Sequence, residues 1–253
     1  MIRGIYSAAS GMIAEQFVQD TLAGNLANLN TVGYKQDAPT FKSLQDLALK
    51  RIEGGTRTPV GAIGMGVAFD HTSTSMAAGA LAKTGNDLDA ALVGNGFFTV
   101  NTPLGERYTR AGQFHLQPDG KGADGKPTAF LADDAGNKVM GLKGPIQVGD
   151  VKKIAIGQQG DVVVNDQVVD RLKLVNGPDG SFEKAGGNLF TAKGALTPST
   201  ATVQSGVLEQ SNVSAITGMV QMIAVQRAYE AAQHAITSQD DSLGKAVNEV
   251  GRA

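Results

Sequence analysis

The most regular hydrophobic pattern of the chain lies near the C-terminus, where apolar residues recur at seven-residue intervals. The first position of this repeat holds Met222, Tyr229, Ile236, Leu243 and Val250, and a second position holds Val225, Ala232 and Ala246. Such a repeat is typical of a helix that packs against another helix in a coiled coil. We expect this helix to be capped by Ser211 or Asn212 and to run to the chain end.

A second helix is predicted at the N-terminus, over residues 2–29. Its apolar residues follow one another at three- and four-residue spacing and are Ile2, Ile5, Ala9, Met12, Val18, Leu22, Leu26 and Leu29. The pattern stops at residues 30–33, where Gly33 is suited to a helix C-cap. A long helix with an exposed apolar seam needs a partner helix, so we expect the two ends of the chain to pair.

The middle of the chain reads as β structure. Short runs with β propensity at residues 96–100, 107–110, 154–156, 161–164 and 167–175 alternate with turn signals such as residues 118–120, 124–125 and 165–166. Residues 31–75 are polar and rich in glycine, and we interpret them as a partly ordered connector with a short helix over residues 41–52.

The predicted fold class is therefore α+β, with terminal helices forming a coiled-coil-like inner domain around a mostly antiparallel β domain. The expected divisions are an N-terminal helix in residues 1–35, a connector in 36–76, a β-rich outer domain in 77–205 and a C-terminal helix in 206–253.

Composition narrows the function classes. The 253 residues include 22 basic and 24 acidic side chains, so a net charge of −2 predicts neither nucleic acid nor an anionic membrane as partner. The sequence contains no run of eighteen apolar residues, so membrane insertion is not predicted. The N-terminus lacks the pattern of a cleaved signal peptide. Because cysteine is absent, disulfides and thiolate chemistry are excluded. If the chain leaves the cytoplasm, it uses another route.

Candidate chemistry is sparse, and we predict no catalytic residue, no cofactor and no metal site. Gly94 and Gly96 precede a strand rather than a helix, so a turn is favoured over a phosphate loop. The three histidines have no partner at a metal-ligand spacing. The segment 119–125 lacks the acidic positions of a calcium loop and is interpreted as a surface hairpin.

The remaining motifs favour assembly between chains. Asn25 and Asn28 lie inside a helix at a cost in helix propensity, which indicates contacts with neighbouring chains. On the C-terminal helix an apolar face alternates with a mixed-charge polar face, which favours partner-helix packing over a membrane surface. The predicted assembly residues are Leu22, Asn25, Leu26, Asn28, Leu29, Thr31, Gly33, Tyr34, Met219, Met222, Ile223, Val225, Gln226, Arg227, Tyr229, Ile236, Leu243 and Val250.

Three segments resemble the flagellar axial protein family, the rod and hook components of the bacterial flagellum. The N-terminal segment is Asn25-Leu26-Ala27-Asn28 followed by Thr31-Val32-Gly33-Tyr34-Lys35, with Gly24 where the family usually has Asn. The central segments are residues 84–91, 94–98 and 108–112, and the C-terminal ones are residues 206–213, 219–223 and 226–230. Length and the ending at residues 244–252 resemble the proximal-rod subgroup most, with the distal-rod subgroup close behind.

The resemblance implies a structural subunit of the flagellar basal-body rod, exported by the flagellar type III apparatus and polymerised with copies of itself and with other rod and hook proteins. Two other classes stay open. One is a secreted binding module on a coiled coil. The other is an exported cell-wall enzyme, for which Asp87 and Asp89 are the nearest paired carboxylates.

Overall fold

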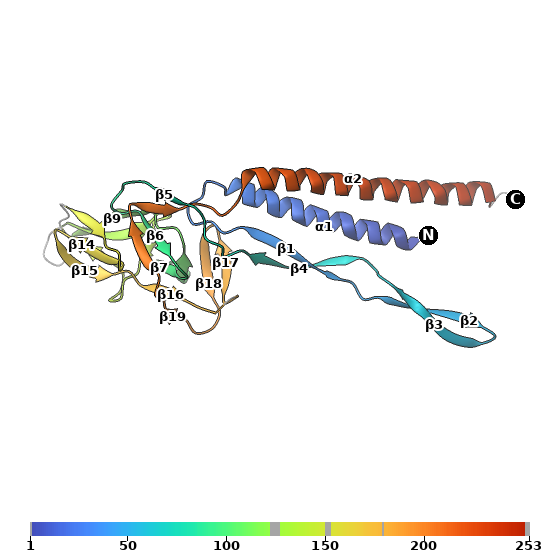
Figure 1. The fold of residues 1–253 in the computed structure, drawn as a ribbon, viewed down its shortest axis with the longest axis horizontal. Helices are drawn as coiled ribbons and strands as arrows, with labels where there is room; N and C mark the ends of the chain where they lie inside the picture. Colours follow the sequence, from blue (N-terminus) through green and yellow to red (C-terminus); the bar gives the residue numbers. More distant parts are fainter. Residues whose placement is uncertain (1, 122–126, 150–152, 179, 251–253) are drawn as a thin grey trace. The chain divides into compact units, whose positions relative to one another are not determined.

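The computed structural model describes residues 2–121, 127–149, 153–178 and 180–250, and the chain divides into two compact units (Figure 1). The first, called the helical unit, comprises Met1–Ala27, Asp37–Ser75 and Ser214–Ala253. The second, called the β unit, comprises Asn28–Gln36 and Met76–Val213. The fold is mixed α+β with antiparallel sheets and a helix at each end, as the sequence predicts.

Both predicted helices are present in the helical unit. Helix α1 spans Ile2–Ala27, helix α2 spans Ala215–Lys245, and a short π-helix, η1, follows at Ala246–Val250. The predicted cap at Ser211 or Asn212 is wrong, because the Ser214 hydroxyl accepts the hydrogen bond from the Thr217 N–H. The helix begins later than expected because Val213 is buried in the β unit.

The two helices pack against each other in an antiparallel sense (Figure 1). Gly4, near the start of α1, lies beside Gln239, near the end of α2, and a Cβ at residue 4 would overlap the Gln239 amide. The residues of α2 that are at least half-buried recur at alternating intervals of three and four: Ala215, Gly218, Met222, Val225, Tyr229, Ala232, Ile236, Gln239 and Leu243. The buried side of α2 therefore follows the seam expected from the sequence.

Residues 37–75 form a two-stranded β ribbon rather than a connector with a helix. Strand β1 (Asp37–Ser43) pairs with β4 (Val67–Thr74), and β2 (Leu47–Glu53) pairs with β3 (Thr56–Ile63). The predicted helix over residues 41–52 is wrong. Gly54 and Gly55 both have positive φ, 57° and 84°, and this two-glycine turn closes a hairpin whose ladder outweighs local helix propensity.

Three phenylalanines attach the ribbon to α1. The ring of Phe69 on β4 stacks on Phe17 of α1 with centroids 4.9 Å apart, and meets the ring of Phe41 on β1 edge-on at 6.3 Å. Val67 donates its N–H to the Ser10 hydroxyl on α1 at 3.3 Å. This cluster fixes one end of the ribbon on the helix.

The β unit contains the remaining strands in chain order. Their bounds are β5 Leu81–Lys83, β6 Ala90–Val93, β7 Phe97–Thr102, β8 Gly105–Thr109, β9 Phe114–Lys121, β10 Pro127–Asp133, β11 Lys138–Val139, β12 Gln147–Val148, β13 Ile154–Ile156, β14 Asp161–Val164, β15 Gln167–Arg171, β16 Leu174–Asn176, β17 Phe182–Gly186, β18 Leu189–Ala192, β19 Thr197–Pro198, β20 Thr202–Ser205 and β21 Val207–Glu209.

The largest sheet has the strand order β12-β10-β11-β7-β8-β18-β17, with β16 also pairing with β7 and β9 with β10. A second sheet has the order β13-β14-β15. The first strands of the unit pair with its last ones, since β5 pairs with β21 and β6 with β20. The unit is therefore closed by segments more than a hundred residues apart in sequence.

The core of the β unit includes runs of consecutive buried residues on β6 and β7, and its largest fully buried side chains include Phe98, Phe190, Leu131, Ile146 and Leu172. The expected turn at Asn165 and Asp166 is confirmed, with φ of 50° and 64°. The expected turn at 118–120 is wrong, because these residues continue β9 and pair with β10 across a register shift. The expected turn at 124–125 lies outside the described residues.

Candidate assembly site

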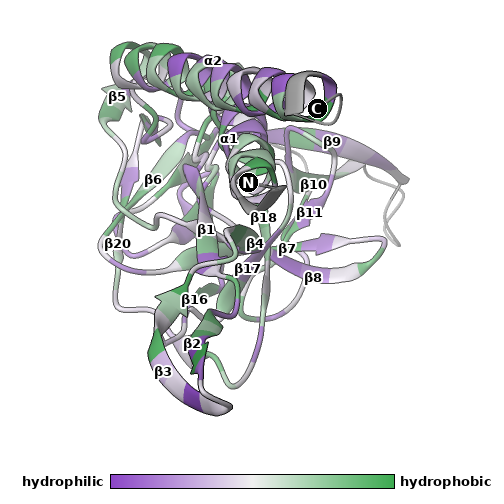
Figure 2. Cartoon of the chain, turned by 90° about the vertical axis from the view of Figure 1, so that its right-hand side faces the viewer, coloured by the Kyte–Doolittle hydropathy of each residue, from purple (hydrophilic) through white to green (hydrophobic). Residues whose placement is uncertain are grey.

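The terminal helices expose large apolar side chains to solvent. On the first two turns of α2 these are Ile216, Met219, Val220 and Ile223, with Ile216 79% exposed, and on α1 they include Tyr6 and Ile13. Figure 2 shows the corresponding alternation of hydrophobic and hydrophilic bands along α2. The stripe 216–223 lies outside the half-buried seam of the same helix, so pairing with α1 leaves it uncovered.

The structure divides the predicted assembly residues into distinct sets. Those that face the interior of the helical unit are Leu22, Asn25, Leu26, Met222, Val225, Tyr229, Ile236 and Leu243, whereas Met219, Ile223, Gln226 and Arg227 are exposed. Val250 lies in η1, and its side chain is outside the described part of the structure. Asn28, Leu29, Thr31, Gly33 and Tyr34 belong to the β unit.

Asn25 has a structural role inside the chain. Its Nδ2 donates to the Asp37 carbonyl at 2.7 Å, and its Oδ1 accepts the Asp37 N–H at 2.9 Å, while only 2% of the residue is exposed. This reciprocal pair joins the last turn of α1 to the start of β1 and offsets the helix-propensity cost. Asn28 acts locally, because its Oδ1 accepts the Thr31 hydroxyl at 3.1 Å.

The segment 28–36, which directly follows α1, is docked on the β unit through its backbone. Gly33 donates its N–H to the Glu209 carbonyl at 2.7 Å and has φ of 66°. A Cβ at residue 33 would overlap backbone atoms of Arg110 and Ala111. Glycine is therefore required both for the left-handed conformation and for the close approach.

A buried cluster of three charged residues holds this segment in place. Lys35 Nζ donates to Glu209 Oε1 at 2.6 Å, and Arg110 Nη1 lies 3.5 Å from Glu209 Oε2. Lys35 and Glu209 are each 1% exposed and Arg110 is 6% exposed. Glu209 Oε1 also accepts the Gly79 N–H at 2.9 Å, so one carboxylate joins four segments of the β unit. We call Lys35, Arg110 and Glu209 the charge cluster.

Burial governs the titration of the two cations in the charge cluster. It lowers the pKa of the Lys35 ammonium, and hydrogen bonding to Glu209 offsets this only in part. Burial also lowers the pKa of the Arg110 guanidinium, again opposed by Glu209. Both cations donate to backbone carbonyls as well: Lys35 to Ala77 at 2.7 Å and Arg110 to Gly94 at 2.8 Å.

Two further residues, Lys184 and Asn212, contact the backbone of Lys35 and Gln36. Lys184 Nζ donates to the Lys35 carbonyl at 2.9 Å and lies 3.7 Å from the centre of the Tyr34 ring. Asn212 Oδ1 accepts the Gln36 N–H at 2.7 Å. The sequence prediction missed Lys35, Arg110 and Glu209 as a functional set. The available signal was that each falls within a segment resembling the family, although these segments lie far apart in the chain.

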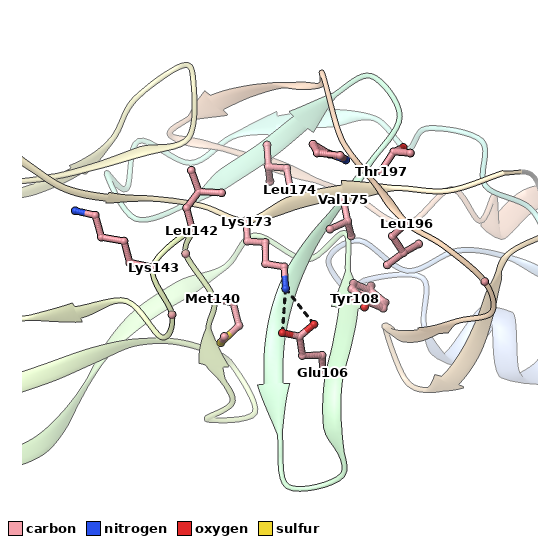
Figure 3. Close-up of a pocket in the computed structure, with 14 residues that line it drawn as sticks. Glu106, Tyr108, Met140, Leu142, Lys143, Lys173, Leu174, Val175, Leu196 and Thr197 are labelled. Atoms are coloured by element: carbon pink, nitrogen blue, oxygen red, sulfur yellow. Dashed lines mark hydrogen bonds and ion pairs between the residues drawn. The ribbon is translucent and has the colours of Figure 1, made fainter.

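The β unit also carries an open hollow of about 760 Å³ beside β8 and β16 (Figure 3). The ion pair between Lys173 Nζ and Glu106 Oε1, at 3.0 Å, crosses its floor, and Leu142 and Leu196 form its sides. Glu106 is the one acidic residue among those that line the hollow, so the lining offers no paired carboxylates for hydrolysis.

The other candidate carboxylates are not arranged as a catalytic pair. Asp89 is 4% exposed and its Oδ1 accepts a hydrogen bond from Asn86 Nδ2 at 3.0 Å, whereas Asp87 is exposed to solvent. Within the described residues, no group of three or more acidic, histidine or cysteine side chains could hold a metal ion. No helix in the described part of the chain has the length and apolar content to span a membrane.

The geometry is thus that of a protein whose terminal helices present apolar surface and whose terminal motifs are tied to a β unit, and comparisons with known proteins agree. Residues 5–35 match the family described as flagella basal body rod protein. Residues 204–249 match the C-terminal family of flagellar basal body rod FlgEFG proteins, and residues 91–164 match the D1 domain of flagellar hook protein FlgE/F/G.

Relatives matched over almost their full length include proteins named FlgG and FlgF. The flagellar basal-body rod protein FlgG of Bacillus subtilis is 33% identical, with 98% of this chain and 99% of the relative covered. FlgF of Caulobacter vibrioides is also 33% identical, over 100% and 99% of the two chains, and FlgF of Rhizobium meliloti is 32% identical. The chain belongs to the flagellar basal-body rod protein family, and the resemblance seen in the sequence is confirmed. It is a structural rod protein.

Proposed function

We propose that this chain builds the rod by polymerising through its terminal helices, which form a coiled-coil-like inner domain once neighbouring copies cover them. The observation that carries the proposal is the uncovered stripe of Ile216, Met219, Val220 and Ile223 on a helix that already uses its other apolar seam to pack on α1. Two apolar faces on one helix require two partners, and the chain supplies one.

Heterologous contacts between copies account for a filament. A surface that binds a different surface on the next copy produces an open helical polymer unless the rotation closes into a ring. In this proposal the stripe 216–223 of one subunit packs on a terminal helix of the next subunit. Burying Ile216 and its neighbours supports the contact by about 1.5–3 kcal/mol per fully covered aliphatic side chain.

The proposed partners are copies of the same chain, other rod and hook proteins, and the flagellar export apparatus that delivers the subunit. The proposed location is the rod of the basal body where it crosses the periplasm. Among rod proteins we place this chain in the proximal rod, on the basis of the resemblance of residues 244–252 to the proximal-rod subgroup.

A truncation tests the role of α2. Removing residues 214–253 leaves Val213, which is buried in the β unit, and we expect the remaining β unit to unfold at an unchanged urea concentration. The truncated chain should fail to restore motility in cells that lack the gene, and it should not form sedimenting polymers with the full chain. Assembly of the truncated chain would overturn the proposal.

A surface variant separates assembly from folding. Replacing Ile216, Met219, Val220 and Ile223 by serine removes the exposed stripe without touching the half-buried seam, so the helical content of the monomer should stay the same. Polymer formation in sedimentation velocity should fall. Gln233→Ala with Ser238→Ala, on exposed positions of the same helix, is the matched control and should assemble normally.

The proximal position is tested by identifying neighbours in the assembled rod. A photo-crosslinking residue at Ile223 should capture proximal-rod proteins and copies of this chain. Capture of distal-rod and hook proteins alone would assign the chain to the distal rod and leave its role as a rod subunit intact.

A further inference from the structure

The charge cluster in the β unit is unbalanced. It contains two cations, Lys35 and Arg110, and a single carboxylate, Glu209. Lys35 and Glu209 are each 1% exposed, and Arg110 is 6% exposed. A buried charge without a counterion is expensive, because the interior solvates it far less well than water does.

The contacts show which of the two cations is in excess. Without the Lys35 ammonium, Glu209 Oε1 keeps the Gly79 N–H at 2.9 Å, and Oε2 keeps Arg110 at 3.5 Å. The Ala77 carbonyl, which accepts from Lys35, also accepts from Asn212 Nδ2 at 3.1 Å. Every partner of Lys35 therefore has a second donor, and removing its charge leaves no buried acceptor alone.

Removing the carboxylate has the opposite effect. Loss of the Glu209 charge leaves Lys35 and Arg110 with neutral acceptors alone, which include the carbonyls of Ala77, Leu92 and Gly94. Arg110 Nε already has no hydrogen-bond partner among the described residues. Two buried cations would then lack any anion, which is the arrangement that destabilises buried ion pairs most strongly.

We propose that the charge cluster is a poised latch, in which Glu209 closes the segment 28–36 onto the β unit and the excess charge of Lys35 keeps that closure reversible. The segment sits between α1 and β1, so opening the latch releases the residues that follow α1 from the β unit. This inference goes beyond the proposed function and does not depend on it, because it concerns the monomer.

The latch has a direct reporter. The Gly33 N–H donates to the Glu209 carbonyl at 2.7 Å, so its hydrogen exchange measures opening of the segment. In the full chain, Lys35→Met should slow exchange at Gly33 by about tenfold, and Glu209→Gln should speed it by about tenfold or more. Lys83→Met, which removes an exposed lysine on β5 of the same unit, should leave the rate unchanged.

The sign of the Lys35→Met effect decides the inference. Faster exchange in this variant would mean that Lys35 stabilises the docking of the segment 28–36 on the β unit. The inference that its charge keeps the docking reversible would then be wrong. If Glu209→Gln does not fold, the Lys35→Met measurement still decides, because that variant leaves all buried acceptors paired.

The pH dependence gives an independent readout. Because burial lowers the pKa of Lys35 in the folded state, the unfolded chain binds more protons between that pKa and the ordinary lysine pKa of 10.5. The free energy of unfolding of the β unit should therefore rise with pH over this window, and the difference from Lys35→Met should shrink. The groups facing Lys35 are Glu209, Arg110, Lys184 and Tyr34. A difference that does not change with pH would overturn the inference.

Discussion

The helical unit and the β unit use their apolar residues in opposite ways. Among the described residues of the helical unit only Leu22, Asn25 and Val225 are buried, while the β unit contains fully buried side chains on most of its longer strands. The helical unit instead exposes residues such as Ile216, Val220 and Tyr6. A unit with a core holds its own fold, whereas a unit whose apolar surface stays in water is suited to be completed by neighbours.

The largest expected effect comes from breaking the core of the β unit. Phe98 is 0% exposed and its ring meets Phe114 edge-on with centroids 5.2 Å apart. Phe98→Ala should lower the free energy of unfolding of the β unit by about 3–5 kcal/mol, measured by urea unfolding. Leu104→Ala, at a residue 82% exposed on the same unit, should change it by less than about 0.5 kcal/mol. Equal effects would contradict the described core.

The next effect tests the docking of the segment 28–36. Gly33→Ala places a Cβ against the backbone atoms of Arg110 and Ala111, and it puts a non-glycine residue in the left-handed conformation. We therefore expect the free energy of unfolding of the β unit to fall by about 3 kcal/mol. Gly85→Ala is the matched control, because Gly85 has φ of 76° and open space around its Cβ position. It should cost only about 1 kcal/mol. A similar loss in both variants would show that conformation alone matters.

A smaller effect is expected in the helical unit. Ser214→Ala removes the acceptor for the Thr217 N–H and should reduce the stability of α2 by about 0.5–2 kcal/mol, seen as faster amide exchange in its first turn. Ser214→Asp keeps a capping oxygen and adds a charge that favours the helix N-terminus, so it should exchange as slowly as the unchanged chain. Loss of β-unit stability in Ser214→Ala would contradict the separation of the two units.

The smallest expected effect is a gain in the stability of the β unit. Asn165 and Asp166 form the turn between β14 and β15 with positive φ at both residues. Asp166→Gly should raise the free energy of unfolding of this unit by about 0.5–1 kcal/mol, because glycine adopts this conformation without strain. Val168→Gly, at an exposed strand position nearby, should instead lower it.

Local patterns in the sequence predicted much of this architecture. The seven-residue repeat of Met222 to Leu243 predicted both α2 and the side of it that is buried, because periodicity depends only on helix geometry. Residues 154–156 and 161–164 were predicted as strands and form β13 and β14. The predictions were wrong where pairing between strands determines the local structure. Residues 41–52 have helical propensity, yet the turn at Gly54 and Gly55 brings β3 alongside and the ladder prevails.

The candidate site was predictable only in part. Leu22 and Val225 were expected at a helix seam and are buried there. The charge cluster was not foreseen, because Lys35, Arg110 and Glu209 are separated by up to 174 residues and no local pattern relates them. Asn25 was singled out by its propensity cost and was expected to contact a neighbouring chain, whereas the structure pairs it with the Asp37 backbone of its own chain.

By itself the sequence determined the two terminal helices, the β character of the middle and the family, because these depend on periodicity, turn chemistry and motifs that a single segment carries. Only the tertiary structure decided that Ile216, Met219, Val220 and Ile223 stay exposed while α1 covers the seam of α2. It also decided that one carboxylate would be buried with two cations. The second outcome depends on closure of the β unit by strands from its opposite ends, which brings together residues that no local rule connects.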